Sequence, residues 1–304
     1  MASFLHSNLG PLKVGYFVAT FLFAVVTVQT HRYFREFNGD PALFKILVMV
    51  IWLTELIHQI SLGFLFHWFT ITCFGTLGIY TTPLPQTFAA VIVATTIIAL
   101  LVSSFFTYRL WASTGNVVLV VVSVVLVAGR FISSCIVADT ERHGLTLTAF
   151  IAHGKPLMTT AWACSAAIDL LLTLALCYDL HSRQHMALYR TARMIDRLMM
   201  LCVATGMLTS ISTIAVTICF LTMDNAAVWT AFYIPISRMF STSLLVSLNA
   251  RKCLRHAGSS MVIDMDSRSQ ALRQQGSKDS SSCAPLEVTI VRETLKNTPN
   301  LCGE

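Results

Sequence analysis

The sequence predicts an all-α, polytopic membrane protein in which seven transmembrane helices form a bundle and a polar tail follows. Of the 304 residues, 55% are hydrophobic and only 12% are charged, against roughly a quarter charged in an ordinary soluble domain. The apolar residues gather in blocks that are long enough to cross a bilayer, which takes about 20 residues of helix. The Lys and Arg residues lie in short clusters between these blocks. This pattern is typical of membrane proteins, so no nucleic-acid partner is predicted.

Seven segments meet the length criterion. The first is not followed by a small-residue cleavage site, which predicts a retained helix rather than a cleaved signal peptide. The fourth is rich in valine, which would favour a buried strand in water, but its length favours a helix in lipid. Residues 1–255 therefore form the predicted transmembrane domain, and residues 256–304, rich in Ser, Gln, Asp and Gly, a disordered cytoplasmic tail. The expected helices are residues 11–30, 43–66, 88–108, 117–137, 158–180, 198–222 and 226–249.

The distribution of basic residues predicts an outside N-terminus and a cytoplasmic C-terminus. Only Lys13, Arg142 and Lys155 lie on the side expected to face outside. The opposite side carries most of the Lys and Arg, which by the positive-inside rule makes it cytoplasmic. The plasma membrane is the favoured location. The basic residues on the cytoplasmic side are Arg32, Arg35, Lys45, Arg109, Arg183, Arg190, Arg193, Arg197, Arg251, Lys252 and Arg255.

Four ionisable residues stand inside the expected spans, where each costs at least about 2.5–3.5 kcal/mol on insertion scales. Glu55 and Asp169 are anionic, whereas Arg130 and Arg238 are cationic, so the set can neutralise itself. Asp169 and Arg238 have opposite charges near one depth and are expected to be energetically coupled.

The surroundings of these charges leave two interpretations open. His58 and Gln59 follow Glu55 by three and four residues, so the three share a helix face. Pro235 precedes Arg238 and removes one backbone hydrogen bond, and a kinked helix beside a charge often lines a polar cavity. One interpretation is a ligand-binding pocket near the middle of the membrane, and the other is a structural network that holds the bundle together. The candidate residues are Glu55, His58, Gln59, Arg130, Asp169 and Arg238.

The nine cysteines have irregular spacing and form no zinc framework. Cys73 and Cys135 are both expected on the outer side and are candidates for a disulfide. Cys253, just after the last helix, is a candidate for S-palmitoylation. His181 and His185 lack further ligands, so no metal site is predicted. Signatures of hydrolases, zinc proteases and nucleotide-binding proteins are absent from the sequence, so neither enzymatic activity nor a cofactor is predicted.

Short motifs on five of the expected helices carry a family resemblance. The motifs are Leu9-Gly-Pro, Gln29-Thr-His-Arg-Tyr-Phe, Trp52-Leu-Thr-Glu-Leu-Ile-His, Asp169 with Leu176-Cys-Tyr, Ile195-Asp-Arg-Leu-Met, Thr205-Gly-Met-Leu-Thr-Ser and Ser243-Leu-Leu-Val-Ser-Leu-Asn-Ala-Arg. Together they resemble a fungal, largely basidiomycete, seven-helix membrane family known as domain of unknown function 6534. The resemblance spans roughly residues 9–255 and implies a seven-helix protein of fungal membranes without an assigned activity. Where the family tends to carry Ser-Lys-Leu-Tyr-Val-Asn, this chain reads Ser237-Arg-Met-Phe-Ser-Thr, and an Arg cannot form a retinal Schiff base.

The preferred function is a receptor-like or sensory protein that responds to a small-molecule ligand and signals to a cytoplasmic partner through the loop between the fifth and sixth helices and the tail. Tyr108-Arg109-Leu110 only faintly resembles the switch motif of G-protein-coupled receptors, and the seventh helix lacks Asn-Pro-x-x-Tyr. The alternative is a transporter or channel whose site contains Glu55, His58, Asp169 and Arg238, although no internal repeat is evident. A membrane enzyme ranks third.

Overall fold

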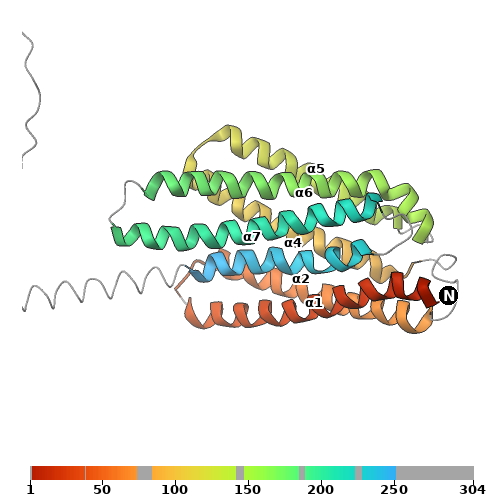
Figure 1. Cartoon of the computed structure of the whole chain (residues 1–304). Coiled ribbons are helices and arrows are strands. Elements are labelled where there is room, and N and C mark those ends of the chain that lie inside the picture. The colour runs from red at the N-terminus through yellow and green to blue at the C-terminus, as the bar shows by residue number, and fades with distance from the viewer. Residues whose placement is uncertain are drawn as a thin grey trace, which may run out of the picture. The chain divides into compact units, whose positions relative to one another are not determined.

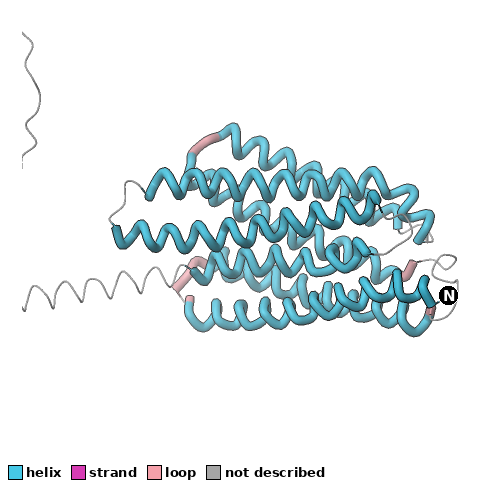
Figure 2. Tube along the Cα trace, in the orientation of Figure 1, coloured by secondary structure: helices cyan, strands magenta, loops and turns pink. Residues whose placement is uncertain are grey.

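The computed structural model describes residues 2–37, 39–73, 84–141, 147–184, 189–222 and 228–250. Within these ranges the chain consists of helices joined by short loops (Figure 2). The helices are α1 (Ala2–Glu36), α2 (Ala42–His67), the short π-helix η1 (Trp68–Thr72), α4 (Gln86–Thr114), α5 (Val117–Glu141), α6 (Leu147–Gln184), α7 (Tyr189–Thr222) and a last helix, Val228–Ala250. The predicted tail, residues 256–304, lies outside the described residues.

Each of the seven predicted segments lies in a helix over its described residues; residues 226 and 227 of the seventh lie outside them. α1, α6 and α7 are longer than expected, because a helix continues into the polar interface for as long as its backbone groups bond each other, whereas the apolar criterion counts only the hydrocarbon span. Pro11 and Pro156 lie inside α1 and α6. The valine-rich segment is the helix α5, as its length predicted.

The turn between α4 and α5 is built by two residues. Gly115 has a φ of 63°, a left-handed conformation that glycine adopts without strain, and it ends α4 with a bond from its N–H to the Trp111 carbonyl (3.0 Å). Asn116 then caps α5, because its Oδ1 accepts a hydrogen bond from the Val118 N–H (3.0 Å). The chain reverses within two residues.

The described helices expose their apolar side chains, which is the reverse of a water-soluble fold. Val118 and Val125 of α5 are 70% and 63% exposed, and Phe17 and Phe21 of α1 are 65% and 70% exposed. Within the described part of the chain, six helices are long and apolar enough to cross a membrane, and α7 adds a shorter apolar stretch, Gly206–Thr222. The protein is therefore a multi-pass integral membrane protein.

Successive membrane-spanning helices run in alternating directions (Figure 1), and among the six spans found in the described residues the last helix is the most buried. The helices α1, α2, α4, α5, α6 and α7 pack largely in chain order, and α4 also contacts α6. In the last helix 67% of the residues in the most apolar stretch are buried, against 11% in that of α5. Side chains of the last helix contact α1, α2, α4, α6 and α7. Any polar residue on it is therefore placed among several helices at once.

Candidate functional site

Arg238 of the last helix forms a buried ion pair with Glu55 of α2. Its Nη1 lies 2.8 Å from Glu55 Oε2, and both side chains are fully buried. Two charges in an apolar interior are stable only when each finds its counter-charge and further hydrogen bonds. The pair therefore fixes the last helix against α2.

Hydrogen bonds extend this pair to two more helices. Gln59 Oε1 accepts a hydrogen bond from Arg238 Nη2 (2.7 Å), while Gln59 Nε2 donates to Thr20 of α1 (2.9 Å). His58 Nδ1 contacts Arg238 Nη1, and its Nε2 lies 3.0 Å from Thr95 Oγ1 of α4. The group Glu55, His58, Gln59 and Arg238, called the Arg238 network below, thus connects α1, α2, α4 and the last helix. As their spacing predicts, Glu55, His58 and Gln59 lie on one face of α2, and all three contact Arg238.

Two serines and one phenylalanine complete the Arg238 network. Ser241 Oγ donates to Glu55 Oε1 (2.6 Å), and Ser237 Oγ accepts from Arg238 Nη1 (2.7 Å). The guanidinium also lies 5.9 Å from the ring centroid of Phe23 in α1, within the range of a cation–π contact. Sequence reasoning missed both serines. The available signal was that they flank Arg238, but a buried serine can equally bond its own helix backbone, as Ser123, Ser133 and Ser210 do.

Asp169 does not pair with Arg238, in contrast to the sequence-based expectation. Its electrostatic partner is Arg130 of α5, and neither residue has an ion pair within 4.0 Å in the described part of the chain. The reason is helix position: α2, not α6, presents its acidic residue to Arg238. The hypothetical pocket of four residues is therefore two separate groups, the Arg238 network and a second pair, Arg130 and Asp169.

The second pair is less well bonded. Asp169 is 8% exposed, and its Oδ2 is buried without a hydrogen-bond partner. The buried Nη1 of Arg130 also lacks one, while its guanidinium lies over the Phe240 ring at 4.8 Å. Tyr233 of the last helix lies between the two groups in its interactions, since it interacts with Arg130 and with Thr95, the residue that contacts His58.

The cysteine predictions have different outcomes. Cys73 and Cys135 are not joined in a disulfide. Cys73 is buried with Leu9, Trp68 and Phe69, and this burial raises the pKa of its thiol, whereas Cys135 is exposed on α5. Their different surroundings explain why they do not meet. Cys253, the palmitoylation candidate, and His185 lie outside the described residues.

Comparison with known proteins finds a family model that matches the C-terminal part of the bundle. Residues 165–253 match the model of a family of unknown function, DUF6534. The match confirms the resemblance for this stretch, which runs from within α6 through α7 and the last helix and includes Asp169 and Arg238. No curated protein and no solved structure matches the chain. The fungal origin of the resemblance stays a prediction.

Proposed function

We propose that this protein is a receptor-like sensory membrane protein in which the Arg238 network is the element that changes on signalling. The supporting observation is that one buried guanidinium joins the last helix to α2 and, through Gln59 and His58, to α1 and α4. A shift of the last helix would break these bonds together, because one guanidinium makes them all and a charge that loses its partners in an apolar interior is costly. Such an element has two discrete arrangements, as a switch requires.

The proposal includes the orientation and the location of the protein. The N-terminus faces outside and the C-terminus the cytoplasm, with the plasma membrane as the location. In support, the C-terminal ends of α1, α4, α6 and the last helix lie at one end of the bundle (Figure 1), and Arg35, Arg109 and Arg183 lie at or near three of these ends. At the same end Arg109 Nη1 donates to Ser247 Oγ of the last helix (2.6 Å). Movement of the last helix would therefore change the surface offered to a cytoplasmic partner.

Substitution of Glu55 tests the proposal. Glu55→Gln removes the charge that holds Arg238, whereas the control Glu36→Gln removes the carboxylate of the exposed Arg32–Glu36 pair (3.2 Å) at a helix end. With a labelling enzyme fused to the C-terminus, we expect Glu55→Gln to change the set of labelled cytoplasmic proteins and Glu36→Gln to leave it unchanged. Identical labelling in wild type and both variants contradicts the switch.

The same two proteins, wild type and Glu55→Gln, also test the alternative function, which is transport. Purified wild type and Glu55→Gln are reconstituted in vesicles that contain a pH-sensitive dye, and an ion gradient is imposed. We expect no flux above that of empty vesicles from either protein. Flux in wild type that Glu55→Gln abolishes would replace the receptor-like proposal with transport through the Arg238 network.

A further inference from the structure

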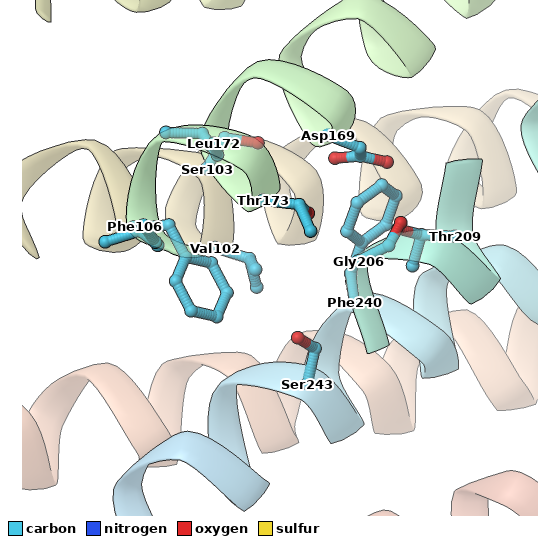
Figure 3. Close-up of a pocket in the computed structure, with 11 residues that line it drawn as sticks. Val102, Ser103, Phe106, Asp169, Leu172, Thr173, Gly206, Thr209, Phe240 and Ser243 are labelled. Carbon is cyan, nitrogen blue, oxygen red and sulfur yellow. The ribbon is translucent and has the colours of Figure 1, made fainter. Parts of the chain in front are cut away.

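An open groove of about 620 Å³ lies on the surface of α6, beside Leu221 near the end of α7. The cavity next to Asp169 lies among four helices (Figure 3), whereas every residue that lines this groove is exposed or half-buried. Along α6 these residues recur at intervals of three and four positions, from Ala152 to Cys164, so they share one face of the helix. Because the exposed surface of the bundle faces lipid, the groove opens into the bilayer.

The groove extends over about one leaflet of the membrane. The apolar part of α6 runs from Ala152 to Asp179, so Ala152 and Lys155 lie at its boundary with the polar interface. From Ala152 to Cys164 the helix rises about 18 Å, at 1.5 Å per residue, which is close to half of a hydrocarbon core of about 30 Å. The groove thus follows the path of one acyl chain, from the interface toward the middle of the bilayer.

The deeper part of the groove suits a hydrocarbon chain. Ala163, Cys164 and Leu221 line it, and the neighbouring Thr159 and Thr160 donate their hydroxyl hydrogens to carbonyls of their own helix (2.7 and 2.8 Å). These hydroxyl hydrogens therefore need no partner from a ligand. A chain that fills the groove gains dispersion contacts with its walls, which an empty groove would lose.

The boundary end of the groove is positively charged. Lys155 lines it and is half-buried. An ammonium group has three N–H donors, so it can bind an anionic headgroup in addition to a contact within the protein. A charged head at the interface with an apolar path below it matches an anionic amphiphile, whose charge stays at the interface while its chain enters the bilayer.

We propose that this groove binds a long-chain fatty acid, with its carboxylate at Lys155 and its chain along α6 as far as Cys164. Recognition of acidic phospholipids typically uses clusters of about four to eight Lys and Arg residues. The side expected to face outside carries only Lys13, Arg142 and Lys155, so its charge matches a single carboxylate better. The site is separate from the Arg238 network and does not depend on the proposed receptor-like function.

Native mass spectrometry of the full chain in detergent tests this site, with palmitate, its uncharged methyl ester or the short-chain hexanoate added in a concentration series. We expect one bound palmitate per chain, weaker binding of methyl palmitate and no displacement of palmitate by hexanoate. Lys155→Gln should weaken palmitate binding about fivefold, as expected for the attraction of one Lys to an anion at the membrane surface. The matched control Lys13→Gln, at an exposed position of α1 and at the same end of the bundle, should bind palmitate as wild type does.

Two further variants test the path of the chain and keep the experiment decisive if Lys155→Gln does not fold. Ala163→Phe fills the deeper part of the groove and should weaken palmitate and methyl palmitate alike, by about tenfold, because the chain loses its contacts there. Ala167→Phe, at an exposed position one turn further along α6 and outside the groove, should change neither. Equal affinities for palmitate and its methyl ester, equal effects of the two Lys variants, equal effects of the two Phe variants, or displacement of palmitate by a lower concentration of phosphatidylserine would overturn the fatty-acid site.

Discussion

The Arg238 network and the Arg130–Asp169 pair each place one Arg and one carboxylate inside the helical bundle, but only in the first do the two charges form an ion pair. Arg238 contacts its counter-charge at 2.8 Å, and four polar side chains bind this pair directly. Arg130 and Asp169 form no ion pair within 4.0 Å, and Asp169 borders a cavity. Both groups keep buried atoms without a hydrogen-bond partner: Glu55 Oε2 and Arg238 Nε in the first, and Asp169 Oδ2 and Arg130 Nη1 in the second. The comparison teaches that buried charges of the same kind hold helices together only where they meet their counter-charge directly.

The largest loss of stability is expected when one member of the Glu55–Arg238 ion pair is removed. Glu55→Gln or Arg238→Gln should each lower the free energy of unfolding by about 3–5 kcal/mol, because the remaining charge stays buried without its partner. The double variant should lose clearly less than the sum of the two single losses. Denaturation in mixed detergent micelles measures all three.

The same experiment checks which carboxylate belongs to Arg238. Asp169→Asn combined with Arg238→Gln should give additive changes, within about 0.5 kcal/mol, because the two residues share no direct bond. Strong coupling between Asp169 and Arg238 with none between Glu55 and Arg238 would reverse the assignment of the two groups.

The sequence was sufficient for the helices and for the ionisable residues inside them, but not for the pairing of these charges or for the serines that bond to them. Hydrophobic length identifies each span, and the spacing of Glu55, His58 and Gln59 places them on one face. The partner of Arg238 depends on which helix lies beside it and how that helix is rotated, and these are set by packing over the whole bundle. For the same reason the cavity beside Asp169, to which α4 contributes Ser103, has no counterpart in any local motif.

A smaller loss of stability is expected from a larger side chain where helices α6 and α7 meet beside Asp169. A methyl group at Gly206 would overlap the hydroxyl of Thr173, so Gly206→Ala should lower stability by about 1–3 kcal/mol. Gly129→Ala is the control, because its nearest neighbour, Cys164 Sγ, would lie at an ordinary 3.8 Å. Thr173→Ala in the Gly206→Ala background should restore most of the loss. A loss that persists in this double variant would place the strain elsewhere than at Thr173.

The smallest change in stability is expected when Asp169, which forms no ion pair within 4.0 Å, is replaced. This substitution compares the two carboxylates, Glu55 and Asp169, most directly. Asp169→Asn should change the free energy of unfolding by no more than about 1 kcal/mol, since a neutral amide costs less to bury and no direct ion pair is lost. The weakened attraction to Arg130 partly offsets this gain. Chemical unfolding beside Glu55→Gln, with Asp139→Asn as the exposed control, measures the difference between the two carboxylates. A loss of stability as large as that of Glu55→Gln would mean that Asp169 stabilises the bundle as Glu55 does. The two carboxylates would then have the same structural role, which contradicts the difference drawn between the two groups.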